Sequence, residues 1–351
     1  LSYFRHILLL CILLLISGCS SFGYYSQSIQ GQLDVFNKTE AIAEKLADPS
    51  ISEELREQLN TVLKLRAFSI QELNLPDNQS YFSYADLKRD YVVWNIFATE
   101  EFSLQPLQSC FLFVACLDYH GFFYNQYDHA YSVTLKAKAM DTYLGGVSAY
   151  STLGWFDDPV LNTMLKWSEA RLAAVIFHEL THQLFYLKDD TEFNESLADA
   201  IAIIGVRKWF QRSKQFTQLN AYEDYLAREK TFVDLILNYK PQLEALYRKK
   251  IDPALLRQEK QNLLNRLKTE YSDISKQWEF DYYGNWIRDK LNNASLASVV
   301  SYRKYLDPFL ALYEYHGQSL SDFYAAIEQL MNCDKDQRED ILNNAISDIN
   351  C

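Results

Sequence analysis

HELTH at residues 178–182 and NESLAD at residues 194–199 are the two stretches that decide the fold of this chain. His178 and His182 are four residues apart, so a helix would place them on one face, as two ligands of the same metal ion must lie. Glu179, which lies between them, can exchange a proton with a water molecule on that ion. The second stretch supplies carboxylates that could complete the site. Together they predict a metal centre held between two helices.

The residues around HELTH predict a buried helix over 168–187. A helix that is apolar all round is buried, and the apolar side chains here are Leu172, Ala173, Ala174, Val175, Ile176, Phe177, Leu180, Leu184 and Phe185. Polar groups buried in such a helix destabilise the fold unless a hydrogen bond, an ion pair or a metal ion replaces their contacts with water. A Zn²⁺ ion would compensate both histidines, whereas the alternative is two core histidines with ordinary partners. Zinc would make its bound water acidic, so we expect Glu179 to be the catalytic base.

The third ligand must be sought after His182. An extension of the motif by glycine and a third histidine is excluded, because Phe185 and Lys188 stand at those positions. Two acids in the following turn and one in the first turn of the next helix have other roles, as turn, N-cap or dipole partners. Glu195 and Asp199 remain, four residues apart on one helix face. One can bind the metal while the other accepts a hydrogen bond from a ligating histidine.

The first 18 residues predict a lipoprotein signal peptide. Residues 7–16 are an apolar run that is too short to span a bilayer. Small residues then precede Cys19, which resembles the lipobox of bacterial lipoproteins and implies cleavage before Cys19 and acylation of that residue. Ser20 and Ser21 resemble an outer-membrane sorting pattern. We therefore expect a lipid-anchored envelope protein on the periplasmic side of the outer membrane; the alternative is a plain signal peptide with an incidental cysteine.

Composition predicts one domain over residues 19–351. The chain has 351 residues, of which 48% are hydrophobic, and no linker rich in Gly, Pro or Ser stands out. The net charge of −12 argues against nucleic acid as a partner. Two long, charged and periodic stretches predict a helical hairpin extension over about residues 220–280. The oligomeric state does not follow from these features.

Four cysteines lie beyond Cys19, and an even number in an exported chain predicts disulfides. The favoured pairing joins neighbours along the chain, Cys110 with Cys116 and Cys333 with Cys351. A rival interpretation combines the first two of these cysteines with His120 and His129 in a second metal site.

Local patterns predict an α+β fold that is mostly α, with a small antiparallel sheet beside the active-site helix. Helices are expected at 32–47 and 52–73, and short strands at 91–97, 111–115, 131–135 and 145–152, with Gly145-Gly146 as a turn. The remaining expected helices cover 168–187, 193–210, 222–249, 253–278, 298–315, 320–332 and 337–349.

The motif pair resembles the gluzincins, a thermolysin-like class of zincin metallopeptidases. The resemblance implies a zincin-like fold with His178, His182 and Glu195 as zinc ligands, Glu179 as the base, and Asp199 orienting a ligand.

The same resemblance suggests where a substrate would bind. It implies an oxyanion donor from a later segment, for which Tyr302 is the candidate, with Tyr283 and His316 as alternatives. It also implies an edge strand that pairs with the substrate backbone, for which the candidates are Ala149, Tyr150 and Ser151.

Residues 145–165 (GGVSAYSTLGWFDDPVLNTML) and 176–199 (IFHELTHQLFYLKDDTEFNESLAD) resemble the bacterial putative aminopeptidase family. The likeness covers most of residues 23–210 and, more loosely, 298–330. It implies a zinc peptidase lipoprotein with a peptide substrate. The alternative is an envelope assembly or chaperone-like lipoprotein that keeps zinc for structure or client binding.

Overall fold

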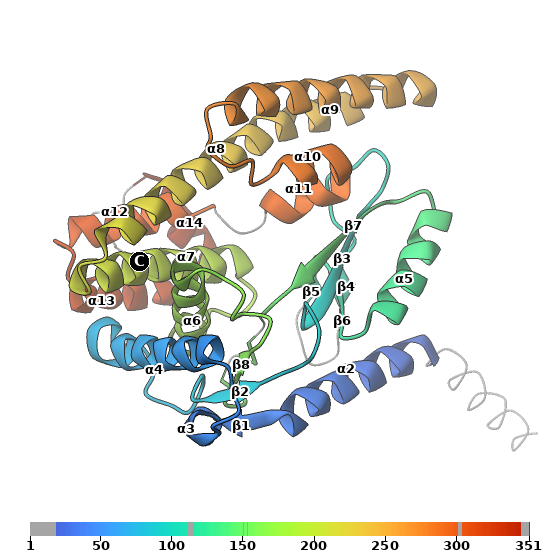
Figure 1. Cartoon of the computed structure of the whole chain (residues 1–351). Coiled ribbons are helices and arrows are strands. Elements are labelled where there is room, and N and C mark those ends of the chain that lie inside the picture. Colours follow the sequence, from blue (N-terminus) through green and yellow to red (C-terminus); the bar gives the residue numbers. More distant parts are fainter. Residues whose placement is uncertain (1–18, 111–115, 150, 153, 301–303, 345–350) are drawn as a thin grey trace, which may run out of the picture.

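The computed structural model describes the chain except residues 1–18, 111–115, 150, 153, 301–303 and 345–350. Most of the described residues are helical and the strands form small sheets, which confirms a mostly α member of the α+β class (Figure 1). Among these residues, no helix combines the length and apolar character that a bilayer crossing requires.

The N-terminal half supplies all of the described strands. Its helices are α2 (Cys19–Asn37), α3 (Ile42–Ala47), α4 (Glu53–Leu73) and α5 (Asn125–Ala137). The strands are β1 (Thr39–Ala41), β2 (Ser83–Ala85), β3 (Val93–Thr99), β4 (Ser109–Cys110), β5 (Cys116–Leu117), β6 (His120–Phe122), β7 (Asp141–Val147) and β8 (Val160–Leu161).

The C-terminal half is helical. It contains α6 (Glu169–Leu184), α7 (Thr191–Arg212), α8 (Phe216–Tyr247), α9 (Pro253–Ser275), α10 (Gly284–Asp289), α11 (Asn293–Val300), α12 (Leu306–Tyr315), α13 (Leu320–Asn332) and α14 (Lys335–Asn344).

Helices α6 and α7 form the centre of the core. Each begins at a capping side chain: Ser168 accepts from the backbone N–H of Arg171 at 3.4 Å, and Asp190 accepts from that of Phe193 at 3.2 Å. Gly205 of α7 lets the two helices approach closely, because a Cβ there would lie 2.6 Å from the ring of Phe177. The contact between the two helices is therefore tight enough to hold side chains of both in a fixed relation.

The sheet nearest the core has the order β6-β3-β7 and is antiparallel. Strand β7 pairs with β3 on one side, and no other described strand pairs with its second edge. The strand predicted at 91–97 is β3, shifted by two residues. The strand predicted at 111–115 lies outside the described residues.

Two strand predictions are wrong. Residues 131–135 belong to helix α5, where Tyr131 and Leu135 are one turn apart and both face inward, so the apparent alternation was a helical spacing. Gly145 and Gly146 lie inside β7 and make no turn. Gly146 is needed there because a Cβ would lie 2.5 Å from the ring of Tyr91, which covers the strand.

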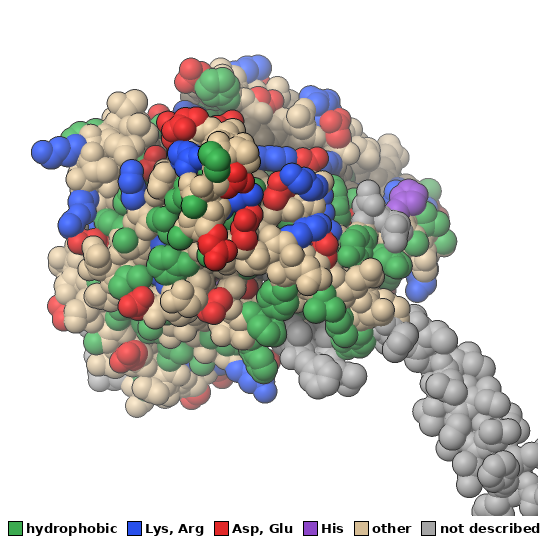
Figure 2. Space-filling view, turned by 60° about the horizontal axis from the view of Figure 1, so that its bottom comes forward, with side chains coloured by type: hydrophobic (Ala, Val, Ile, Leu, Met, Phe, Trp, Pro, Cys, Tyr) green, Lys and Arg blue, Asp and Glu red, His purple; other side chains and the backbone are tan. Residues whose placement is uncertain are grey.

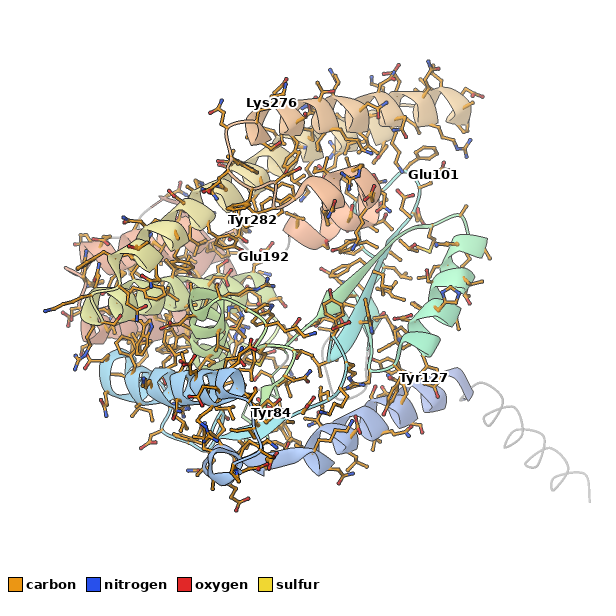
Figure 3. All side chains as sticks on the ribbon, in the orientation of Figure 1. Tyr84, Glu101, Tyr127, Glu192, Lys276 and Tyr282 are labelled. Carbon is orange, nitrogen blue, oxygen red and sulfur yellow. A yellow bond between two sulfur atoms is a disulfide. The ribbon has the colours of Figure 1, made fainter. Side chains whose placement is uncertain are left out.

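Helices α8 and α9 form a hairpin with an apolar core of its own (Figure 1). Lys260 of α9 fastens it to the sheet: its Nζ lies 2.7 Å from Oδ2 of Asp141 at the start of β7 and donates to the Glu101 carbonyl at 2.8 Å. Arg257 also donates to the Glu101 carboxylate at 2.8 Å, and Figure 3 shows Glu101 beneath α9. The position of β7 is thus tied to that of the hairpin.

The last helices support the start of α7. Arg338 of α14 donates to Oδ2 of Asp190 at 2.7 Å in a buried ion pair and to the carbonyl of Cys333 at 2.8 Å. Cys333 and Cys351 form a disulfide, with a Cα–Cα distance of 5.2 Å, as predicted. The α7 N-cap is therefore held by the end of the chain.

The other cysteine pair is only partly described. Cys110 and Cys116 stand opposite each other on β4 and β5, and their disulfide, like the rival metal site, stays a prediction.

Candidate metal centre

Helices α6 and α7 bring three potential ligand atoms together. The Nε2 atoms of His178 and His182 are 3.0 Å apart. The Glu195 carboxylate lies 3.3 Å from the first through Oε2 and 3.6 Å from the second through Oε1. Among the described residues, this is the group of His, Cys, Asp and Glu side chains that could hold a metal ion.

The spacing of these atoms fits a metal ion. Ligands about 2.0–2.1 Å from a tetrahedral zinc ion are about 3.3–3.4 Å from one another, and the three measured separations, 3.0, 3.3 and 3.6 Å, surround that value. Two ring nitrogens whose lone pairs face each other at 3.0 Å would repel each other. A cation between them, or a proton on one of them, removes this repulsion. Two imidazoles and one carboxylate are also ligands that zinc commonly takes.

Asp199 occupies a different position from Glu195. Its Oδ1 lies 2.9 Å from Nδ1 of His178, on the side of the ring away from His182. A proton on Nδ1 donates to this carboxylate and leaves the Nε2 lone pair directed at Glu195 and His182. The two acids that sequence reasoning left open therefore face different nitrogens of one ring.

The turn between the two helices is closed by side-chain bonds. Asn194 accepts from the backbone N–H of Leu187 at 2.8 Å and donates to its carbonyl at 2.7 Å. Asp189 adopts a left-handed backbone, with φ of 63°, just before the N-cap. These bonds explain how so short a connection can place Glu195 beside both histidines.

Glu179 carries the chemistry expected of a proton acceptor. It is half-buried, and burial raises its pKa to about 7; the charge of His178 lowers the pKa, while that of Glu195 raises it. A carboxyl group with a pKa near neutrality can both accept and release a proton under physiological conditions. The buried helix predicted from the sequence is the cause of this shift.

The two histidines differ in their surroundings. Burial, reinforced by His178, lowers the pKa of His182 to about 4, so its imidazole is neutral at pH 7, as a metal ligand must be. Burial also acts against a charge on His178, but Asp199 and Glu195 outweigh it and raise its pKa. Within the described chain, Nδ1 of His182 is buried without a hydrogen-bond partner.

The residues expected to bind the substrate backbone are not on a strand. Strand β7 ends at Val147, and Ala149 and Ser151 follow it in irregular backbone, so the strand predicted over 145–152 is wrong in its second half. Ser151 instead donates to Oδ2 of Asp158 at 3.1 Å, in a loop that this buried acid holds together. Tyr150 lies outside the described residues.

Two of the three candidate oxyanion donors are described, and both lie on other elements than the two helices of the centre. Tyr302 lies outside the described residues. Tyr283 stacks on Phe232 in the core of the hairpin, at 4.0 Å between ring centroids. His316 is the C-cap of α12.

Sequence reasoning missed Tyr119, which precedes β6. Burial raises its pKa to about 12, and the charges of Glu195 and Glu179 add to that shift, so its hydroxyl lies within the electric field of the site. Its ring packs against Phe97 of β3 at 5.5 Å. Nothing in the local sequence marks Tyr119, because its position beside Phe97 depends on the pairing of β6 with β3.

Of three comparisons with known proteins, one gives a match. No curated protein and no solved structure matches the chain. One family model, described as "Putative aminopeptidase", matches residues 23–342, which include every residue of the candidate centre. The chain therefore belongs to the putative aminopeptidase family.

Proposed function

We propose that this protein is a zinc-dependent peptidase. The observation that carries the proposal is the convergence of His178, His182 and Glu195, whose ligand atoms lie within 4.8 Å of one another, beside the half-buried Glu179. When bound there, zinc would polarise a peptide carbonyl and acidify a water molecule. Family membership supports peptide hydrolysis as the reaction.

The protein's own residues supply the remaining steps. Glu179 takes the proton from the attacking water and delivers it to the amine that leaves, since its pKa of about 7 suits both transfers. Asp199 keeps the proton of His178 on Nδ1. Tyr119 is our candidate for a donor to the oxygen on which negative charge develops, because its hydroxyl already lies in the field of Glu179 and Glu195.

The free edge of β7 is the candidate for binding the substrate backbone. An extended peptide can add to an exposed strand through main-chain hydrogen bonds. Figure 1 shows β7 on the side of its sheet that faces α6 and α7. In place of residues 149–151, we propose the part of β7 that follows Thr142, because the Thr142 carbonyl already accepts from Asn292 at 2.9 Å.

A peptide-library digest analysed by mass spectrometry tests the activity. Wild type should cleave peptides, and Glu179→Gln should not, although it keeps its zinc. Removal of single N-terminal residues would establish an aminopeptidase, and internal cuts would establish an endopeptidase. Equal cleavage by the two proteins would contradict the role given to Glu179, and no cleavage by zinc-loaded wild type would contradict the proposed function.

We also propose that Cys19 carries a lipid anchor in the cell envelope. Cys19 is the first residue after the predicted signal segment, and the described part of α2 runs from it to Asn37. Mass spectrometry of the mature N-terminus should find an acylated Cys19, and Cys19→Ser should release the protein from the membrane fraction. An intact segment 1–18 on the mature protein would contradict this.

A further inference from the structure

Helix α2 packs against the protein through a face that carries both polar and apolar side chains. Gln27, Gly31 and Val35 are buried. Gln27 accepts from the backbone N–H of Phe123 at 3.0 Å, and Gly31 is required because a Cβ there would lie 2.1 Å from the Phe123 ring. The Tyr24 ring also packs on this side, edge-on to His120 and Phe122, but the large aliphatic side chains of α2 do not.

Those larger side chains lie on the opposite face. Ile29 is 61% exposed and Leu33 is 52% exposed, and with the half-buried Phe36 they follow the i, i+4, i+7 spacing of one helix face. The apolar stripe of an amphipathic helix usually faces the core, whereas α2 leaves Ile29 and Leu33 exposed to solvent. Figure 2, which turns this end of the molecule forward, shows hydrophobic side chains along α2 beside the grey N-terminal segment.

A loop extends the same face. Phe156 packs edge-on against Phe36, at 5.0 Å between ring centroids, and is itself 52% exposed. Its neighbour Trp155 is 85% exposed. We call the five side chains the outer apolar surface: Ile29, Leu33, Phe36, Trp155 and Phe156.

The position of the outer apolar surface indicates what covers it. The predicted anchor, Cys19, and Ile29 lie on the same helix ten residues apart, which is about 15 Å along its axis. A bilayer that holds the anchor is therefore within reach of the surface. Tryptophan and phenylalanine are also side chains that settle at the boundary between headgroups and acyl chains.

We propose that the outer apolar surface inserts into the headgroup region of a phospholipid bilayer and orients the protein on it. The interaction is apolar and needs no anionic lipid. Asp34 is the one charged residue of α2, and Lys38 just beyond the helix pairs with it at 3.0 Å. The net charge of −12 would repel anionic headgroups.

Docking in this way would fix the orientation of the candidate metal centre relative to the membrane. Gly154, next to Trp155, lies against Gln183 of α6: a Cβ placed on Gly154 would be 3.5 Å from Cγ of Gln183. The loop that touches the bilayer therefore also touches the helix that carries His178 and His182. The inference concerns orientation on the membrane and is independent of whether zinc or peptide binds.

Vesicle flotation tests the proposal with a chain that begins at residue 19 and carries Cys19→Ser, so that no acyl group contributes. This chain keeps every described element. It should float with phosphatidylcholine vesicles, and adding phosphatidylglycerol should not strengthen binding. Ile29→Glu combined with Leu33→Glu should weaken partitioning by at least about tenfold, because two apolar side chains then no longer leave water.

Phe216→Glu combined with Leu237→Glu is the matched control, because these α8 side chains are 57% and 42% exposed. The control should bind vesicles as the parent does. Trp155 fluorescence should be quenched by brominated phosphatidylcholine, and this quenching should be absent in Trp155→Phe. Failure of the parent to float, or equal loss in the control, would overturn the proposal. The proposal would also be overturned if, without lipid, the parent chain were a dimer and the Ile29→Glu, Leu33→Glu variant a monomer. A second copy of the chain would then cover the surface.

Discussion

Replacing Asp199 with asparagine changes one contact of the candidate metal centre and leaves its three ligand atoms in place. In the wild type, the Asp199 carboxylate accepts from Nδ1 of His178 at 2.9 Å. An asparagine oxygen could still accept, but it carries no charge and holds the tautomer of His178 less firmly. We therefore expect zinc to bind more weakly while the fold is unchanged.

The size of the effect follows from this contact. A hydrogen bond to a charged group contributes about 1.5–3 kcal/mol, and about 1.4 kcal/mol corresponds to a factor of ten in a dissociation constant. The Asp199 side chain is 26% exposed, so water screens part of the interaction and the lower half of the range applies. Asp199→Asn should raise the zinc dissociation constant by about 10–40-fold, within the range known for such orienting groups.

Competition with a chromophoric zinc chelator measures this change, and circular dichroism verifies the fold. Glu192→Gln is the matched control: it lies one helix turn before Glu195, but it pairs with Lys304 at 3.2 Å and not with a histidine. The control should bind zinc as the wild type does. If Asp199→Asn also binds zinc with wild-type affinity, the orienting role assigned to Asp199 is refuted.

Four further predictions concern proton transfer, pH and support of the site. Glu179→Gln should lower kcat by a factor of about 10²–10⁴ in a fluorogenic peptide assay. The variant should contain as much zinc as the wild type, which separates this effect from loss of the metal. In the metal-free protein, burial opposes the charged form of Glu179, so its pKa of about 7 lies above its value in the unfolded chain. The Tm of the wild type should therefore fall as the pH rises from about 5 through neutrality. A fall of the same size in Glu179→Gln would disprove this. Tyr119→Phe should lower kcat and leave KM and zinc content nearly unchanged; an unchanged kcat removes Tyr119 as an oxyanion donor. Arg338→Ala leaves Asp190 buried and unpaired and should reduce the free energy of unfolding by about 3–5 kcal/mol in urea titrations, whereas a loss below about 1 kcal/mol would show that the pair does not support α7.

The centre could be predicted because its members are local to two helices. His178 and His182 are related by helical periodicity alone, and so are Glu195 and Asp199. Which acid faces which nitrogen depends on how α7 crosses α6, and only the resemblance to gluzincins indicated that from the sequence. The contact at Gly205, which sets the approach of the helices, has no local signal.

The small sheet was harder to predict than the helices. Its strands are short, and their pairing depends on residues far apart in the chain, as with β3 and β7. Gly145-Gly146 is a common turn sequence, yet the ring of Tyr91 makes a glycine necessary within β7. Tyr119 lies beside Phe97 because β6 pairs with β3, another pairing between distant residues, and it therefore escaped notice.

The alternative function, envelope assembly, makes a different demand on Glu179. A chaperone-like protein that keeps zinc only for structure or client binding does not need the base. Glu179→Gln should therefore fail to rescue a deletion phenotype if hydrolysis is the function. Full rescue would favour the alternative.

Elemental analysis of the purified full chain tests the central claim most directly. After purification without chelators, the wild type and Glu179→Gln should each contain one zinc ion per chain, and Glu195→Ala and His182→Ala should contain little or none. A wild type that neither contains zinc nor takes it up on addition would contradict the account, and so would zinc that persists when both Glu195 and His182 are replaced.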